Sequence, residues 1–200
     1  RTIPVGRSLQ PEHHVTTHDH LQAILEQTDG PIVMNECICR KAAAMRGKPC
    51  RTTSRLETCM ALGDTARNCL RAGMGREIDR EEALEIARRN EEEGLVLQPS
   101  NSLDVEFVCA CCGCCCGMLS VYKRLPKPVE FWASNFYASV DAETCIACEA
   151  CVERCPVRAV AVVEALGAAE VNLDRCLGCG NCVVTCPTGS ITLHKKDRES

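Results

Sequence analysis

Two cysteine runs in the last third of the chain constrain this sequence more than any other feature. Each run has the form Cys-x2-Cys-x2-Cys-x3-Cys-Pro, and the runs begin 31 residues apart, at Cys145 and Cys176. An apolar segment follows each run, at 160–163 and at 191–193. The repeat predicts two units of strand, cysteine loop, short helix and strand. Because neither unit has enough apolar surface to fold alone, we expect the two to pack face to face.

The spacing within each run is that of a metal–sulfur ligand set. Three cysteines at two-residue intervals wrap a tight loop around one 4Fe–4S cube, and the fourth ligates the other cluster. The first predicted set is Cys145, Cys148, Cys151 and Cys186. The second predicted set is Cys176, Cys179, Cys182 and Cys155. Disulfides or zinc sites would give no reason for this doubled crossover spacing.

The segment from about Ser139 to His194 resembles the bacterial ferredoxins that carry two 4Fe–4S clusters. The resemblance covers little more than a quarter of the 200 residues. It implies a ferredoxin-like α+β fold, with two clusters placed for fast electron exchange.

The cysteine content bears on metal binding and on the redox state of the compartment. Nineteen cysteines, an odd number, exclude complete internal pairing, and the chain starts without an apolar signal segment. Aromatic residues make up only 3% of the chain, so the core has little bulky material besides its metal sites. We therefore expect a metalloprotein in a reducing, cytoplasmic compartment.

Eleven cysteines lie outside the two runs, and the sequence alone does not assign them. Ten are possible further cluster ligands: Cys37, Cys39, Cys50, Cys59, Cys109, Cys111, Cys112, Cys114, Cys115 and Cys116. Alternate residues of an extended segment point to opposite sides, so residues 109–117 can serve two clusters, each completed from the 37–59 set. Arg40, Lys41 and Arg46 would offset the anionic charge. Cys69, within a predicted helix, is better explained as a buried structural cysteine.

The whole layout resembles larger ferredoxin-like proteins of anaerobes. These join a Cys-x-Cys-Arg region and a Cys-x-Cys-Cys-x-Cys-Cys-Cys region to a dicluster ferredoxin tail, and the resemblance implies architecture, not activity. One or two further Fe–S clusters are the favoured interpretation of the N-terminal cysteines. A zinc site and free or redox-active thiols are the alternatives. Cys111-Cys112-Gly113 is also similar to the CCG motif of heterodisulfide-reductase-type subunits, which hold a catalytic cluster.

We expect an α+β protein with three parts: a tail or linker over 1–18, a mainly helical Cys-rich module over 19–138, and a dicluster ferredoxin domain over 139–200. Apolar spacing and end signals predict helices over 19–27, 58–71 and 79–93, the last with an Asp79–Glu82 capping box and Gly94 as its stop. Short strands are expected over 32–34 and 95–97.

Charge and composition favour electron transfer between proteins. No apolar run reaches the roughly 20 residues that span a bilayer. The formal net charge is −4, and each cluster with four thiolates adds roughly −2. This acidic balance argues against nucleic-acid binding and favours redox partners with basic docking patches. The sequence thus predicts a multi-cluster electron carrier, or an electron-transfer subunit of an oxidoreductase. A redox or oxygen sensor, and an oxidoreductase with a catalytic cluster at 109–117, are the alternatives.

Overall fold

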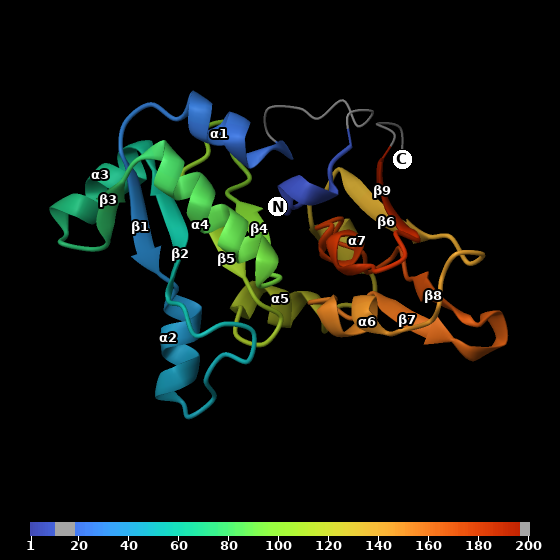
Figure 1. Ribbon diagram of the computed structural model, residues 1–200. Helices are drawn as coiled ribbons and strands as arrows, with labels where there is room; N and C mark the ends of the chain where they lie inside the picture. The colour runs from blue at the N-terminus through green and yellow to red at the C-terminus, as the bar shows by residue number, and fades with distance from the viewer. Residues whose placement is uncertain (11–18, 197–200) are drawn as a thin grey trace.

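The computed structural model describes residues 1–10 and 19–196 and contains two adjoining halves, each with its own buried core. The first half is built on a five-stranded sheet and the second on two two-stranded sheets. Figure 1 shows the halves side by side, with the N-terminal segment between them. No helix in the described part of the chain combines the length and apolar character needed to cross a bilayer.

The sheet of the first half is antiparallel throughout, in the order β3-β1-β2-β5-β4. Its strands are β1 (Ile32–Glu36), β2 (Glu57–Leu62), β3 (Arg76–Ile78), β4 (Val96–Pro99) and β5 (Phe107–Cys111). In the central pair, Met60 of β2 lies opposite Val108 of β5. Side chains alternate between the faces of a strand, so β2 and β5 each contribute to both sides of the sheet.

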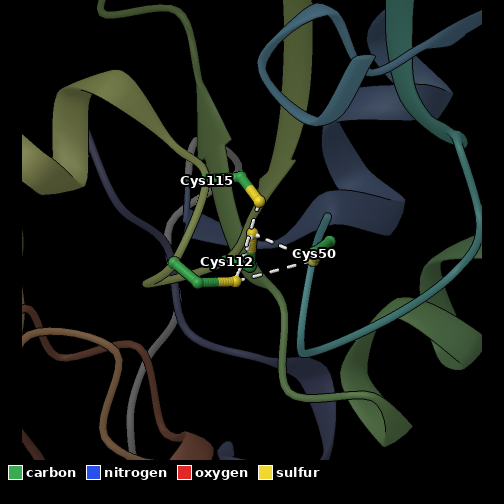
Figure 2. Close-up of side chains that lie close together, drawn as sticks. Cys50, Cys112 and Cys115 are labelled. Carbon is green, nitrogen blue, oxygen red and sulfur yellow. Dashed lines mark hydrogen bonds between the residues drawn. The ribbon is translucent and has the colours of Figure 1, made fainter. Parts of the chain in front are cut away.

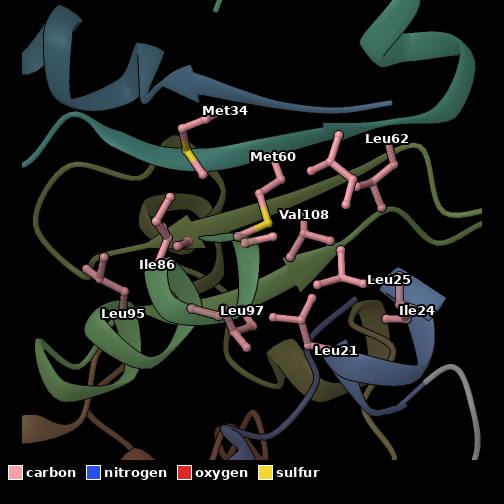
Figure 3. Close-up of a cluster of buried hydrophobic side chains, with 14 of the residues drawn as sticks. Leu21, Ile24, Leu25, Met34, Met60, Leu62, Ile86, Leu95, Leu97 and Val108 are labelled. Carbon is pink, nitrogen blue, oxygen red and sulfur yellow. The ribbon is translucent and has the colours of Figure 1, made fainter. Parts of the chain in front are cut away.

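Helices cover both faces of this sheet. The covering helices are α1 (Leu21–Gln27), α3 (Gly63–Arg71) and α4 (Arg80–Glu92). Helix α2 (Ile38–Met45) follows β1, and α5 (Gly117–Tyr122) packs into the core of the second half. Leucine and isoleucine side chains of α1 and α4 pack with Met60 and Val108 on one face, as Figure 3 shows. On the other face Ala66 of α3 packs against Val33 and Ala61. The amide N–H of Glu82 donates to the Asp79 side chain at the start of α4, confirming the predicted cap.

The second half repeats one unit twice, as the 31-residue offset predicts. The first unit comprises β6 (Phe136–Val140), α6 (Ala150–Arg154) and β7 (Val160–Val163). The second comprises β8 (Ala168–Val171), α7 (Asn181–Thr185) and β9 (Ile191–Lys195). Strand β6 pairs with β9 and β7 with β8, so each sheet takes one strand from each unit. The exchange of strands explains why neither unit needs a complete core of its own.

The first ten residues differ from the expected tail. Ile3 and Val5 are fully buried, and Ile3 forms a β-bridge with Leu97 of the first half. The amide of Val5 donates to the carbonyl oxygen of Cys179 in the second half. This segment therefore joins the two cores. Residues 11–18, the remainder of the expected tail, lie outside the described residues.

Two further expectations need correction. The Cys-rich module is a mixed α/β unit organised around a five-stranded sheet, whereas the sequence predicted a mainly helical one. The helix expected over 58–71 is a strand followed by a helix, β2 and α3. Residues 57–62 include the helix formers Met60, Ala61 and Leu62. Their position between β1 and β5 overrides that propensity, because a central strand buries both faces.

Candidate metal centres

One cavity in the second half is lined by cysteines from both runs. Its cysteines are Cys145, Cys148, Cys151 and Cys186. The first three come from the loop before α6 and from α6 itself, and the fourth ends α7. The structure therefore brings together the four residues that the spacing predicts for the first cluster.

A second cavity has the reciprocal composition. Its cysteines are Cys155, Cys176, Cys179 and Cys182. Here Cys155, which ends α6, joins the three cysteines of the second run. Cys155 Sγ accepts a hydrogen bond of 3.2 Å from the Ala159 amide, and in the first cavity Cys145 Sγ accepts one of 3.4 Å from the Ala169 amide. Backbone donors directed at sulfur stabilise a thiolate ligand, so both cavities suit the binding of an anionic cluster.

The two cysteine loops have the same backbone path and different side chains. Ala147 and Glu149 of the first loop adopt left-handed φ angles of 52° and 62°, and Gly178 and Gly180 do so at the equivalent positions, with 62° and 75°. A β-carbon on Gly178 would lie 2.1 Å from the Phe136 carbonyl oxygen. One on Gly180 would lie 2.0 Å from Ser8 Oγ, so close packing requires glycine in the second loop.

The cavities also differ in their contact with solvent. In the first, Cys148 is exposed, and hydrogen bonds from Ser190 and Thr188 outweigh partial burial and lower the pKa of Cys186 to about 7. In the second, Cys176, Cys179 and Cys182 are each 8% exposed, and burial raises the pKa of Cys179 to about 12. A buried thiol of this kind needs a bound metal to be a thiolate at neutral pH.

A third set of cysteines lies on strands β2 and β5 and at the ends of two adjoining helices of the first half. We call it the sheet thiol group; its members are Cys37, Cys59, Cys109, Cys111 and Cys116. In the order Cys37, Cys59, Cys109, Cys111 and Cys116, each thiol shifts the pKa of the one before it, so consecutive members of the group are neighbours in space. The strand register explains the convergence, since extending the β2–β5 pairing by one residue from Met60 and Val108 puts Cys59 beside Cys109.

The ends of the sheet thiol group are fixed by two helices. Cys37 is the N-cap residue of α2, and Cys116 is that of α5. A hydrogen bond with Cys111 and backbone amides of α5, partly opposed by burial, lower the pKa of Cys116 to about 6. The positive ends of the two helix dipoles therefore favour negative charge on this group.

A fourth set lies on two loops, and we call it the loop thiol group: Cys50, Cys112, Cys114 and Cys115. Cys50 Sγ is 3.6 Å from the sulfurs of both Cys112 and Cys114. Cys114 Sγ is 3.6 Å from Cys112 Sγ and 3.7 Å from Cys115 Sγ. All four sulfurs lie within 4.8 Å of one another. Figure 2 shows Cys50 approaching Cys112 and Cys115 from the loop between α2 and β2.

Arg40 lies between the two thiol groups of the first half. It is only 2% exposed, and it donates to Thr58 Oγ1 at 2.5 Å and to the Ala110 carbonyl oxygen at 2.7 Å. Burial lowers the pKa of this guanidinium, but the charges of Cys37, in the sheet thiol group, and of Cys112, in the loop thiol group, outweigh that effect and raise it. A buried cation bonded to neutral oxygens is stable only where anions lie nearby. Burial raises the pKa of the Cys112 thiol to about 11, and the neighbouring Cys59 thiol raises that of Cys37, so these cysteines would be such anions when bound to a metal.

Two of the eleven additional cysteines stand apart from these groups. Cys39, predicted as a possible ligand, lies in the first turn of α2 and belongs to neither group. Cys69 packs beside the Val33–Ala61–Ala66 cluster, and its sulfur accepts a 3.9 Å hydrogen bond from Asn35. Of the three basic residues expected near the cysteines, Arg40 is buried, while Lys41 and Arg46 are exposed. The sequence predicted that Arg40 would lie near the anionic cysteines, but it did not indicate that Arg40 would be buried.

Comparison with known families agrees with the geometry of the second half. Residues 137–188 match the family model of the 4Fe-4S dicluster domain. No curated protein matches the chain. The matched segment contains all eight cysteines of the two runs and both cavities that they line. The C-terminal part of this chain is therefore a 4Fe–4S dicluster domain of the ferredoxin type.

Proposed function

We propose that this protein transfers single electrons between redox partners through at least three iron–sulfur clusters. The observation that carries the proposal is the pair of four-cysteine cavities, each with three cysteines of one run and one of the other. Cys145, Cys148, Cys151 and Cys186 would hold one cluster, and Cys176, Cys179, Cys182 and Cys155 the second. Each bound cluster supplies a one-electron couple, and the chain sets its potential through burial and hydrogen bonds to sulfur.

We assign a third cluster to the sheet thiol group. Within the described part of the chain, the loop thiol group is the only set of three or more cysteine, histidine or carboxylate ligands with all ligand atoms within 4.8 Å of one another. The five sulfurs of the sheet thiol group are therefore more widely spaced. Wide spacing is what a cluster needs, since each thiolate binds a different iron. Cys111 and Cys116 also belong to the same packed core as the dicluster cysteines. A cluster there would extend the electron path from the ferredoxin half into the first half.

The first cavity is the proposed point of exchange with a partner. Cys148 is exposed, and the neighbouring Ile146 is 63% exposed. Asp141, Glu143 and Glu149 are exposed on the same loop. An apolar contact ringed by carboxylates suits a partner with a basic patch, whose attraction to the loop would speed the encounter.

Iron and acid-labile sulfide quantification of the anaerobically purified chain, with electron paramagnetic resonance of the reduced protein, tests the proposal. Three 4Fe–4S clusters give about twelve iron and twelve sulfide per chain. A value near eight of each would rule out the third cluster and leave the assignment of the two other clusters intact.

Paired variants test the exchanged ligands. Cys155→Ala and Cys176→Ala should each remove the same cluster, so their double variant should lose no more iron than either single variant. Cys155→Ala combined with Cys145→Ala should lose two clusters. Cys39→Ala, in a cysteine outside all four sets, is the control. The reverse pattern, with two clusters lost in the Cys155/Cys176 double variant and one lost in the Cys155/Cys145 double variant, would show that the fourth ligands are not exchanged.

A further inference from the structure

We propose that the loop thiol group, Cys50, Cys112, Cys114 and Cys115, is a separate site that holds one tetrahedral zinc ion. This inference goes beyond the proposed electron transfer and does not depend on it. It concerns four of the cysteines for which the sequence favoured a further Fe–S cluster.

The sulfur spacing fits a single ion. Four thiolates at about 2.3 Å from a tetrahedral zinc lie about 3.8 Å from one another. Here the sulfurs of Cys50 and Cys114 lie 3.6 Å apart, each lies 3.6 Å from Cys112 Sγ, and Cys114 Sγ lies 3.7 Å from Cys115 Sγ. In a 4Fe–4S cube each thiolate binds a different corner iron, so its sulfurs stand roughly 6 Å apart. The loop thiol group is therefore too compact for a cube.

The ferredoxin half of the same chain provides an internal comparison. There the two sets of four cysteines surround cavities, as ligands of a large cluster must. In the loop thiol group, by contrast, Cys114 Sγ directly contacts the sulfurs of Cys50, Cys112 and Cys115. The space at its centre suits one ion.

A buried charge gives independent support for a ligand at this position. Only 2% of Arg40 is exposed, and its Nε has no hydrogen-bond partner among the described residues. Its guanidinium donates hydrogen bonds to three neutral oxygens, of Arg55, Thr58 and Ala110. A zinc ion with four thiolates carries a net charge of about −2, which would compensate this guanidinium, whereas four neutral thiols would not.

The position of the site indicates what the ion would do. Cys50 belongs to the loop between α2 and β2, and the other three ligands lie between β5 and α5. Gly113, at the centre of the second loop, packs so closely that a β-carbon there would lie 2.5 Å from the Pro156 carbonyl oxygen, beside Cys155. The ion would thus tie two loops together where the first half meets the ferredoxin half, as a closed structural site without an open position.

The test uses the full chain, purified anaerobically, with zinc, iron and sulfide measured on the same sample. We expect one zinc per chain, and zinc-edge X-ray absorption should show four sulfur neighbours at about 2.3 Å. Cys50→Ala should lose that zinc and keep its iron and sulfide. Cys50→His, which retains a zinc ligand, should keep the metal. Cys69→Ala, a cysteine outside both thiol groups, is the matched control.

Three results would overturn the site. Loss of iron together with sulfide in Cys50→Ala would assign these cysteines to a cluster. Zinc unchanged in Cys50→Ala would place the ion elsewhere. An absorption spectrum of the wild-type protein with nitrogen or oxygen neighbours would exclude the four-cysteine set even if the variants fail to fold. The proposed electron transfer would survive each of these results, because it is tested by iron, sulfide and paramagnetic resonance at other cysteines.

Discussion

The side-chain amide of Asn181 donates a 3.0 Å hydrogen bond to the carbonyl oxygen of Gly94. Asn181 is fully buried at the start of α7, and Gly94 ends the α4 segment with a φ of 78°. The bond therefore connects the helix that carries Cys182 to the longest helix of the first half. Arg154 of α6 makes a parallel connection, donating to the carbonyl oxygens of Glu91 and Glu92. Both short helices of the ferredoxin half are thus held by the C-terminal end of α4.

Asn181→Ala should destabilise the protein by about 1–3 kcal/mol, because it leaves the Gly94 carbonyl oxygen buried without its partner. The second cluster should also be lost faster than the first under chelation, since Asn181 lines the second cavity between Cys179 and Cys182, whereas Cys186 of the first cavity lies at the other end of α7. Anaerobic denaturation and iron release kinetics measure the two effects. Asn68→Ala, on the exposed side of α3, should change neither; equal effects in both variants would contradict the coupling.

Arg40→Gln should destabilise the first half by about 3–5 kcal/mol, the cost of leaving buried charges without their partner. Arg40→Lys keeps the charge and loses the forked hydrogen bonds, so its stability should lie between that of Arg40→Gln and that of the wild type. Anaerobic thermal denaturation and metal content are the measurements. Arg46→Gln removes an exposed charge from the end of α2 and should be neutral. If Arg40→Gln is as stable as Arg46→Gln, the thiols around Arg40 are not anionic.

Glu91 should make stability decrease as the pH rises above 4.5. Burial raises the pKa of this carboxyl above its ordinary value of 4.5, although amide hydrogen bonds from Gly6 and Arg7 oppose the effect. The native state therefore holds this proton more tightly than the unfolded chain, and its contribution to stability is lost as the pH rises through the native pKa.

Glu91→Gln keeps an acceptor for Gly6 and removes the titration. It should raise the midpoint of thermal unfolding more at pH 7.5 than at pH 5. Glu92→Gln, at the exposed neighbouring position, should show no such difference. A midpoint shift of Glu91→Gln that is the same at both pH values would exclude this role.

Removal of the clusters should abolish cooperative unfolding of the ferredoxin half. Its core consists largely of cysteines and small apolar residues, with seven of the eight cluster-run cysteines packed in or against it. Ligation therefore supplies folding energy that such a core cannot replace. Calorimetry before and after anaerobic treatment with a chelator and an oxidant measures the change. An iron-free sample with an unchanged transition would contradict the expectation. Air exposure should have a similar effect, because the released thiols are open to oxidation.

The ferredoxin half was largely predictable because its information is local. A cysteine repeat with fixed spacing specifies both loops, and the apolar segments around it became β6 to β9. The capped α4 was predictable for the same reason, since Asp79, Glu82 and Gly94 act within one helix.

The remaining features depend on pairings between distant segments. Cys59 and Cys109 become neighbours only through the β2–β5 register, and Cys50 reaches Cys112 across 62 residues. The alternation within 109–116 predicted that this segment faces two sides, and in the structure its cysteines fall into the two thiol groups, but it did not indicate which cysteine of the 37–59 set joins each group. The burial of Ile3 likewise follows from its bridge to Leu97, which nothing in the first residues encodes.

Because of the glycines in the second cysteine loop, the second loop could replace the first, but the first could not replace the second. A copy of the second loop, with glycine at both left-handed positions, would fit in place of Ala147 and Glu149. The reverse replacement would drive side chains into Phe136 and Ser8. The sequence of the second loop is therefore constrained by the residues packed against it. The first loop exposes Glu149, so its side chains can vary with the surface of a partner protein.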